Sequence, residues 1–407
     1  MRIEVGRDLS QTQSAEWPDF LRRSRHGHPE QDPGFAGGWA AQGHDVVYAM
    51  GHDGDAVRAV AMINIEPGPL GVGLRATAMS GPVCDDPADM RAFLDGLTDH
   101  PAMRRVGQLT ITPYWLAERA TALSDAFDGT DWAPFEEAEL RRTGIHDATG
   151  TPDEIAARFN KSARRKLKKA REFGLEIDYV TDEATALEAF EIHNRHFQDR
   201  TGADMDRDAF LSDFRAVYAQ GDLGALFLVR HEGVILGGCI VHRSADTVFM
   251  RYSFMDDAAT ARIGNIRLAP LITVEALSWG QARGCRYGDE NGYIHGLDPD
   301  HPLYRVYKYK EEFRPAEVQR MPGRRKVLRP AAITGADLAE RALDRAGSAA
   351  TALRGVVGGT KVAHGAQPPA TADSDSPSAR NWVQAVKLPL GLTVGGSAGW
   401  LALMLVD

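Results

Sequence analysis

The sequence is poor in cysteine and lacks the short motifs that mark common catalytic centres. Its three cysteines, Cys84, Cys239 and Cys285, lie far apart, in a spacing that suits neither a disulfide scaffold nor a structural zinc site. No GxSxG, HExxH or Walker motif occurs, and no GxGxxG follows an expected strand. These absences disfavour serine hydrolases, zinc peptidases and P-loop enzymes. The scarcity of cysteine also fits a reducing cytoplasm, and the spacing of the three cysteines gives no indication of a metal site.

Positive charge is in deficit over the whole chain. Its 47 Lys and Arg residues face 56 Asp and Glu residues, which gives a formal net charge of −9. A phosphate-rich partner must therefore be bound by a local basic patch, because the surface as a whole repels it. The N-terminus has no apolar run of signal-peptide length, so export by that route is not expected.

Hydrophobic residues, at 43%, are plentiful enough for a large core, and the order of the elements predicts an α+β (mixed α/β) fold. Segments 45–50 and 56–65 are expected to form one hairpin, and 225–230 and 234–242 another. Thr151 and Glu154 have the spacing of a helix capping box. Further helices are expected at 86–98, 182–200, 206–219 and 266–283, and further strands at 107–112, 175–180, 247–254 and 286–289.

The character of the sequence changes after Pro330. Residues 331–387 combine an Ala-rich, helix-compatible segment with a Pro/Ser/Asp linker that is expected to be disordered. Residues 388–407 form an apolar tail in which 388–406 carry no charge, a length close to one bilayer span of about 20 residues. Five of these 19 residues are Gly or Pro, which weakens a helix. Packing on the body, contact with a membrane surface and a tail anchor all remain open.

A basic helix is expected at 160–171, where seven of twelve residues are Lys or Arg. Phe159, Ala163, Leu167 and Ala170 recur at helical spacing, so one face packs inward and the other carries positive charge. One-signed charge in an acidic protein favours anion binding over a merely solvated face. The expected polyanion-binding residues are Arg164, Arg165, Lys166, Lys168 and Lys169.

A second unusual segment is PLYRVYKYKEEF at 302–313, where tyrosines alternate with basic residues. The alternation indicates a strand or a strand end. A lysine held among aromatic rings is partly desolvated and can stabilise an oxyanion or bind phosphate. On this segment alone, an ordinary amphipathic strand with solvated lysines is the better interpretation.

Several segments in order resemble the FemABX aminoacyltransferases and relatives with a BioF2-like acetyltransferase domain. The resemblance covers about residues 1–325. Its parts are EWPDFLRRSRHGHPEQ near the N-terminus, SGPV at 80–83, the block that runs from TGIHDATG into NKSARRKLKKAREFG, then GGCIVHR, GCRYGDENG and finally YKYKEEF. Each part is loose, but their order and spacing are specific.

The resemblance implies twin GNAT-like acyltransferase domains. The first would cover 1–145 and be completed by about 311–330, and the second would cover 146–310. FemABX proteins move an amino acid from aminoacyl-tRNA to a free amine, usually of a peptidoglycan precursor such as lipid II or its UDP-linked form. The resemblance thus implies a cytoplasmic enzyme, possible contact with the inner face of the membrane through the tail, and no cofactor beyond the co-substrate aminoacyl-tRNA.

The resemblance also implies site residues. The family lysine matches Lys310, and Tyr309 stands where a Phe is usual. Arg251 and Tyr252 match the central strand whose Arg and Tyr side chains help to bind precursor phosphates, and Asp289 lies in the glycine–aromatic–Asp turn. The oxyanion of aminoacyl transfer would be stabilised by Lys310.

Two other functions compete with aminoacyl transfer from tRNA. The first is an acyl-CoA-dependent N-acyltransferase on the same fold, acting in polysaccharide or secondary-metabolite assembly. Its pyrophosphate site would have to be Thr260–Arg267, which has only one glycine and two arginines. The second is a degenerate transferase that binds cell-wall precursors or membrane without catalysis, against which the Lys310 signature argues.

Overall fold

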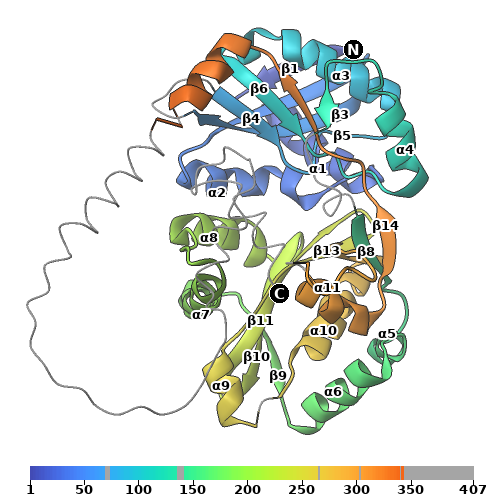
Figure 1. Cartoon of the computed structure of the whole chain (residues 1–407), viewed down its shortest axis with the longest axis vertical. Coiled ribbons are helices and arrows are strands. Elements are labelled where there is room, and N and C mark those ends of the chain that lie inside the picture. Colours follow the sequence, from blue (N-terminus) through green and yellow to red (C-terminus); the bar gives the residue numbers. More distant parts are fainter. Residues whose placement is uncertain (69–73, 135–141, 265, 302–303, 340, 343–407) are drawn as a thin grey trace, which may run out of the picture.

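The computed structural model describes residues 1–68, 74–134, 142–264, 266–301, 304–339 and 341–342. They form two mixed β-sheets with helices against both faces (Figure 1). The expected apolar tail at 388–407, and the part of the expected linker from 343 onward, lie outside the described residues. None of the described helices combines the length and the apolar character needed to cross a bilayer.

The first sheet has the strand order β1-β2-β3-β4-β6-β15-β7, with β5 paired to β3. Most neighbours are antiparallel, but β4 and β6 run parallel and stay paired from Leu74↔Val106 to Ala78↔Ile111. The strands are β1 (Arg2–Gly6), β2 (Asp45–Asp53), β3 (Ala56–Pro67), β4 (Leu74–Ala78), β5 (Val83–Cys84), β6 (Val106–Ile111), β7 (Ala133–Pro134) and β15 (Arg324–Val327).

The second sheet has the order β14-β8-β13-β12-β11-β10-β9. It also contains one parallel pair, β12 with β13, and the two strands are connected through helix α10. The strands are β8 (Arg142–Asp147), β9 (Glu176–Tyr179), β10 (Gly224–His231), β11 (Val234–Ser244), β12 (Thr247–Met255), β13 (Tyr287–Gly292) and β14 (Ala316–Gln319).

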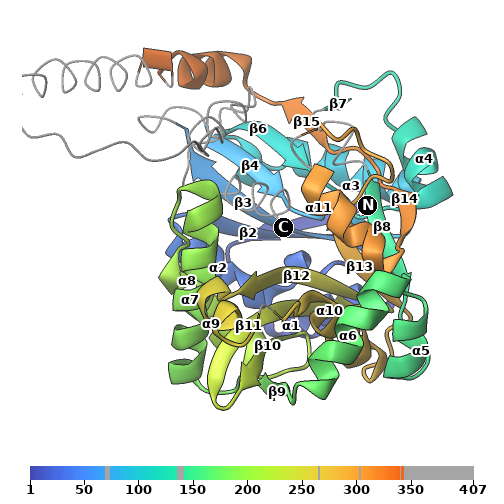
Figure 2. The same cartoon turned by 60° about the horizontal axis from the view of Figure 1, so that its bottom comes forward.

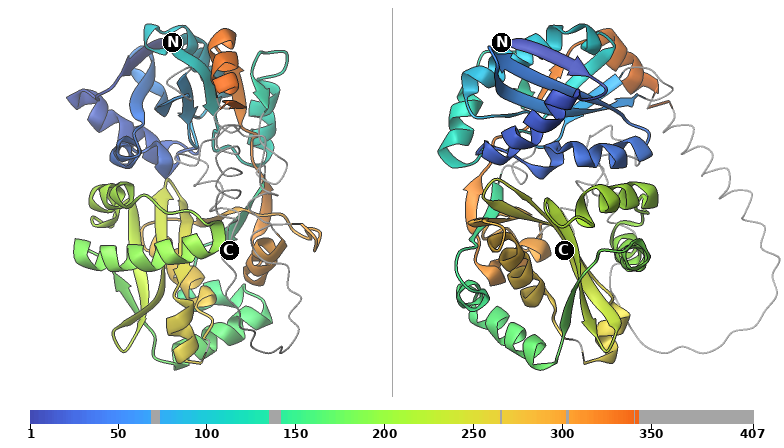
Figure 3. Two further views of the ribbon diagram at one scale, coloured as in Figure 1. Left: turned by 60° about the vertical axis from the view of Figure 1, so that its left-hand side comes forward. Right: turned by 180° about the vertical axis from the view of Figure 1, so that it is seen from behind.

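The helices form layers outside and between the sheets (Figure 2). Helices α3 and α4 cover the outer face of the first sheet, and α5, α6 and α10 cover the outer face of the second. Helix α2 of the first half packs against α8 of the second half, and α1 and α7 border the same buried cluster (Figure 3). The α-helices are α1 (Gln11–Arg23), α2 (Ala36–Ala41), α3 (Pro87–Asp99), α4 (Ala117–Asp125), α5 (Pro152–Ala157), α6 (Lys161–Glu172), α7 (Glu183–Thr201), α8 (Arg207–Asp213), α9 (Asp257–Arg262), α10 (Ala269–Gln281) and α11 (Tyr304–Lys310).

A single hydrophobic core joins the two halves. Trp17, Phe20 and Met62 of the first half lie in the same buried cluster as Phe210 and Phe254 of the second. Burial of apolar surface drives domain association as it drives folding, so the two halves are packed together as one body.

The predicted local patterns are largely confirmed. Both hairpins form, and the second turns through Glu232 and Gly233, which have positive φ angles of 49° and 78°. The capping box is present, with the Thr151 hydroxyl accepting from the Glu154 backbone N–H and the Glu154 carboxylate accepting from the Thr151 N–H. The expected twin-domain mixed α/β fold is therefore observed.

The prediction of a strand at 302–313 is wrong. Residues Tyr304–Lys310 form helix α11, and Glu311–Phe313 continue it as a 3₁₀ turn. Among the described side chains of this helix, Tyr307 and Lys310 are buried, and their spacing of three puts them on one helical face. The alternation of tyrosine and lysine imitated the period of two that marks a strand.

The chain returns to the first half after α11. Strand β14 still pairs with β8 in the second sheet, whereas β15 inserts between β6 and β7 in the first. A helical segment at 330–339 follows, and Arg75 of β4 forms an ion pair with Asp337 there at 3.0 Å.

Candidate functional site

The candidate site lies where β12 and β13 separate. Their pairing runs from Thr247↔Tyr287 to Phe249↔Asp289 and then stops, although both strands continue. Asn291, in the left-handed region with φ 62°, bridges the opening by donating its side-chain amide to the Met250 carbonyl at 2.8 Å. Ligands of open α/β sheets commonly bind where neighbouring strands diverge at their carboxyl ends.

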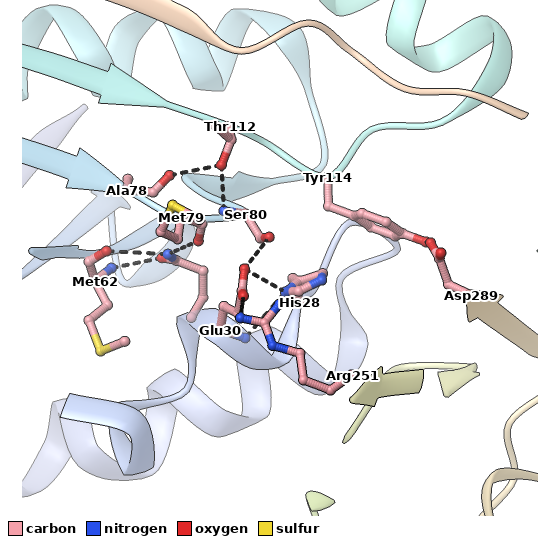
Figure 4. A network of polar contacts seen from close by, with 11 residues as sticks. His28, Glu30, Met62, Ala78, Met79, Ser80, Thr112, Tyr114, Arg251 and Asp289 are labelled. Atoms are coloured by element: carbon pink, nitrogen blue, oxygen red, sulfur yellow. Dashed lines mark hydrogen bonds and ion pairs between the residues drawn. The ribbon is translucent and has the colours of Figure 1, made fainter. Parts of the chain in front are cut away.

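Arg251 is placed at this opening by a β-bulge. Ile240 of β11 pairs with Tyr252 and Val241 pairs with Met250, so Arg251 is the extra residue of β12. Bulges re-aim side chains and are frequent beside active sites. Here the Arg251 side chain leaves its own half of the molecule and reaches Glu30 of the first half (Figure 4).

Glu30 lies in a 3₁₀ turn, Pro29–Gln31, that the Gln31 side chain fixes to Met62 and Met79 (Figure 4). Its carboxylate forms an ion pair with Arg251 and accepts a hydrogen bond from the Ser80 hydroxyl at 2.6 Å.

The electrostatics of this pair follow from its burial. Burial by itself raises the pKa of Glu30, but Arg251, His28 and the Ser80 hydrogen bond together lower it to about 2. Burial lowers the pKa of His28 to about 3, so this imidazole is neutral at pH 7. Burial opposes the charge of Arg251, but Glu30 nevertheless raises the pKa of the guanidinium. The pair is thus a buried carboxylate–guanidinium contact. Removing either partner would leave the other as an uncompensated buried charge.

Asp289, the last residue of β13 that pairs with β12, is also linked to the first half. Its carboxylate accepts hydrogen bonds from the Tyr114 hydroxyl at 2.6 Å, from the Thr143 hydroxyl and from the Asn291 backbone N–H at 2.6 Å. Tyr114 follows β6, and burial raises the pKa of its phenol well above the usual value, so it remains a donor. Asp289 therefore orders the opening and joins the two halves at the same point.

Lys310 ends α11 and lies beside the same strand. Its ammonium donates to the Glu290 and Gly292 carbonyls of β13, at 2.9 and 3.0 Å, and lies 5.9 Å from the centre of the Tyr307 ring. These two carbonyls flank the irregular stretch of β13, whose register with β8 shifts between Asp289 and Gly292. The predicted catalytic lysine is thus buried and fixed at the edge of the opening.

The remaining predicted residues on these two elements have different surroundings. Tyr309, half-buried, turns to the outer core and meets the Phe313 ring edge-on at 5.1 Å. Tyr252 is buried in the core shared by the two halves, with the Arg251 guanidinium 5.3 Å above its ring. The structure therefore brings Arg251, Asp289 and Lys310 to one opening and directs Tyr309 away from them.

Helix α6 presents the predicted basic face to solvent. Ala163, Leu167 and Ala170 are buried beneath it, as the spacing predicts. Lys166 is bound to Glu312 at 2.6 Å, and Lys168 lies 3.7 Å from Glu172. Within the described part of the chain, four exposed cations of this helix have no acidic partner: Lys161, Arg164, Arg165 and Lys169.

Sequence reasoning missed the residues that the first half contributes to the site, above all Glu30, Ser80 and Tyr114. The signal was present, because Glu30 and Ser80 lie inside the EWPDFLRRSRHGHPEQ and SGPV segments that carry the FemABX resemblance. In the described part of the chain, no three His, Cys, Asp or Glu residues cluster so as to hold a metal ion.

Residues 157–290 match the family model described as an acetyltransferase (GNAT) domain. This range contains Arg251, Tyr252 and Asp289, together with helix α6. No curated protein matches the chain.

Solved structures show the fold of the whole described body. FemX is 14% identical, with a TM-score of 0.70 over 81% of this chain and 98% of that one. A conserved protein of unknown function from Bacteroides thetaiotaomicron, also 14% identical, has a TM-score of 0.50 over 80% and 99%. L-PGS from Bacillus licheniformis is 11% identical, with a TM-score of 0.48 over 80% and 96%. The match to FemX shows that the chain has the FemABX-like fold that its sequence predicts, and residues 157–290 resemble a GNAT acetyltransferase domain.

Proposed function

We propose that this protein moves an amino acid from aminoacyl-tRNA to the free amine of a cell-wall precursor, lipid II or a UDP-linked peptide. The observation that carries the proposal is the position of the basic face of α6. Lys166 binds Glu312, and the Asn160 backbone N–H donates to the Glu312 carbonyl at 2.9 Å. Glu312 follows Lys310 by two residues, so α6 is anchored directly beside the lysine segment.

This arrangement suits a polyanion that carries a reactive ester at one end. The four unpartnered cations of α6 attract phosphates, and the electrostatic attraction does not require a particular nucleotide sequence. An acyl ester at the end of such a chain could then reach the opening between β12 and β13. Of the donors considered, aminoacyl-tRNA combines a phosphate chain with a terminal activated ester.

The chemistry needs no covalent enzyme intermediate. The neutral acceptor nitrogen attacks the ester carbonyl and the C–N bond forms; the bond to the ribose oxygen then breaks, and the proton lost by the nitrogen ends on that oxygen, which leaves as a hydroxyl. The protein contributes by orienting the two reactants and by stabilising the oxyanion of the tetrahedral intermediate. We assign the second task to Lys310, and substrate positioning to Arg251, Tyr252 and Asp289.

Acyl transfer from acyl-CoA is the second candidate. It is favoured by the description of the matching domain as an acetyltransferase. Its expected pyrophosphate segment, Thr260–Arg267, spans the end of α9 and the approach to α10, and residue 265 lies outside the described residues. The reaction at the opening would be the same, with a thiolate as the leaving group.

A donor competition distinguishes the two. Purified protein is incubated with lipid II or UDP-linked peptide, together with either labelled aminoacyl-tRNA or labelled acyl-CoA. Label transferred from aminoacyl-tRNA, and lost on RNase treatment, is the expected result. Label transferred from acyl-CoA alone would contradict the tRNA donor and leave the acyltransferase assignment intact.

A further inference from the structure

A pocket lies at the boundary between the two halves, separate from the Lys310 carbonyl contacts. It is formed by the 3₁₀ turn and helix α2 of the first half and by α8, β11 and β12 of the second. Its empty volume is about 330 Å³, part of it open to solvent. The lining residues are Glu30, Phe35, Gly38, Trp39, Gln42, Asp213, His242 and Arg251.

The unusual member of this lining is Asp213, the last residue of α8. Its side chain is 95% buried, yet its Oδ1 atom has no hydrogen-bond partner among the described residues. Buried polar groups are normally satisfied, so an unsatisfied carboxyl that lines a pocket calls for an explanation. One explanation is a bound ligand that donates a hydrogen bond to this carboxyl group.

Gly38 lets helix α2 pack directly against this carboxyl. A Cβ atom at position 38 would lie 2.3 Å from Oδ1 of Asp213 and 3.0 Å from its Cγ, so any side chain there would collide with the carboxyl group. Glycine costs helix stability in the middle of α2. Its presence lets α2 approach α8 closely and places no side chain against the carboxyl from this position.

The charges around the pocket define the ligand that it can accept. Glu30 and Arg251 neutralise each other, and His242, bonded to the Tyr218 hydroxyl at 3.0 Å, is uncharged because burial lowers its pKa well below the usual value. The group left without a counter-charge is the carboxyl of Asp213. Two aromatic residues, Phe35 and Trp39, complete the walls, and aromatic rings attract organic cations.

We propose that this pocket binds the ammonium group of a small organic amine, with Asp213 as its counter-ion. That the amine is a substrate of the acyl transfer rests on the proposed function, whereas the binding itself does not. Arg251 connects the pocket with the opening between β12 and β13, because it lines the pocket and belongs to β12.

Binding should be linked to protonation of Asp213. Burial raises the pKa of this carboxyl well above its usual range, and Arg251 only partly offsets the effect. The ionisable groups around it are Glu30, Arg251, His242, Tyr218 and Tyr252, of which the first two keep fixed charges at neutral pH and the other three stay uncharged. Affinity for an ammonium ion therefore rises with pH as Asp213 loses its proton, until the amine itself becomes neutral.

The test compares three ligands of equal length: pentylammonium, 1-pentanol and pentanoate. Binding to the full chain is measured by saturation-transfer NMR and calorimetry. We expect pentylammonium to bind in preference to the other two. Asp213→Asn, which keeps the shape and removes the charge, should weaken pentylammonium binding about 10- to 100-fold, the effect of losing one charge-assisted hydrogen bond. Asp208→Asn, an exposed aspartate on the same helix, should change nothing.

Gly38→Ala provides a second, independent variant, because it displaces the carboxyl without removing its charge, and it should also weaken binding. Equal binding of all three ligands, no pentylammonium binding to the wild-type protein, or unchanged binding to Asp213→Asn would each overturn the proposal. Acyl transfer is assayed separately. Charge-selective, Asp213-dependent binding without any acyl transfer would uphold the pocket and reject the proposed function.

Discussion

Arg251 and Glu30 show how one extra residue in a strand can shape a site. Without the bulge in β12, the side chain at position 251 would follow the regular alternation of the strand. With the bulge it meets Glu30 of the other half, and neither charge is exposed to water. Removing one partner of such a pair is far more costly than replacing both, because the remaining charge stays buried.

Glu30→Gln should therefore destabilise the protein at pH 7 by about 3–5 kcal/mol. The effect should depend on pH in a defined direction. The pKa of Glu30 is about 2 in the folded protein against an ordinary 4.5, so its stabilising contribution is present above pH 4.5 and disappears as the pH falls toward 2. The shift corresponds to about 3 kcal/mol.

Urea unfolding of both proteins between pH 7 and pH 2 tests this prediction. The difference in unfolding free energy should shrink steadily below pH 4.5. Protonation of the buried His26 also destabilises the fold in acid, because burial lowers its pKa, but it affects both proteins alike and largely cancels in the difference. Glu118→Gln, an exposed substitution, serves as control. A difference that stays constant with pH would show that Glu30 carries no charge at neutral pH.

Lys310→Met should lower turnover in the proposed transfer about 100-fold, the scale of losing one oxyanion donor. Methionine keeps the length of the side chain but leaves the Glu290 and Gly292 carbonyls without their donor, so a lower melting temperature is also expected. Turnover is compared per folded molecule, with Lys308→Met as control, because Lys308 is exposed on the same helix. A variant that has a lower melting temperature but normal turnover would show that Lys310 stabilises β13 and takes no part in the reaction.

At the scale of elements, one face of α6 packs into the core and the other carries positive charge. Small and apolar residues at 163, 167 and 170 pack inward, while Lys166 ties the helix to Glu312. Lys168 lies near Glu172 and Arg171 forms an ion pair with Asp153, whereas Lys161, Arg164, Arg165 and Lys169 have no acidic partner within the described residues. Like charges on one helix repel each other, so these cations destabilise the helix unless they bind an anion.

Arg164→Ala/Arg165→Ala should weaken tRNA binding and reduce its dependence on salt. Each lost phosphate contact lowers the slope of log affinity against log salt by about 0.7 to 0.9, so the double variant should lose about 1.4 to 1.8. Fluorescence titrations between 50 and 200 mM salt measure this change. Over that range, the expected difference in slope changes the ratio of the two affinities by about 10-fold. Arg104→Ala/Arg105→Ala removes the same charge from an exposed site in the first half and should leave the slope unchanged. Identical slopes for both double variants would make α6 a solvated face.

Elements defined by local signals could be predicted, and those defined by distant contacts could not. The turn at Glu232–Gly233 and the capping box of Thr151 depend on residues a few positions apart, so the sequence contains all that is needed. Helix α11 was mistaken for a strand because its burial is decided by β13, to which Lys310 donates. The bulge at Arg251 is equally invisible, since only the register with β11 reveals it.

At the scale of the whole molecule, the two halves have unequal parts in the site. The parallel strands β4 and β6 of the first sheet remain paired over the full length of β4, whereas β12 and β13 of the second sheet separate. The first half instead supplies side chains to the opening of the second, through Glu30 and Tyr114. A resemblance that covered both halves was needed to expect this sharing, because the separate motifs in each half do not indicate it.

The shared core predicts that the two halves unfold together. Trp17 and Phe254 belong to one buried cluster, so opening the boundary exposes apolar surface on both sides. Tyr114 strengthens the boundary by donating to the buried Asp289 carboxylate. Tyr114→Phe should therefore lower the stability of the whole body by about 1.5–3 kcal/mol, the range for a hydrogen bond to a charged group, in a single transition.

Calorimetry provides the measurement, because equal calorimetric and van't Hoff enthalpies identify one cooperative unit. Tyr287→Phe, at an exposed tyrosine of β13, is the matched control and should leave the melting temperature unchanged. If wild-type protein melted in two steps, or if Tyr114→Phe shifted only one of them, the halves would be independent domains. Contacts such as Arg251 with Glu30 would then have to form anew each time the halves meet, and the site at the opening could exist only while they are docked.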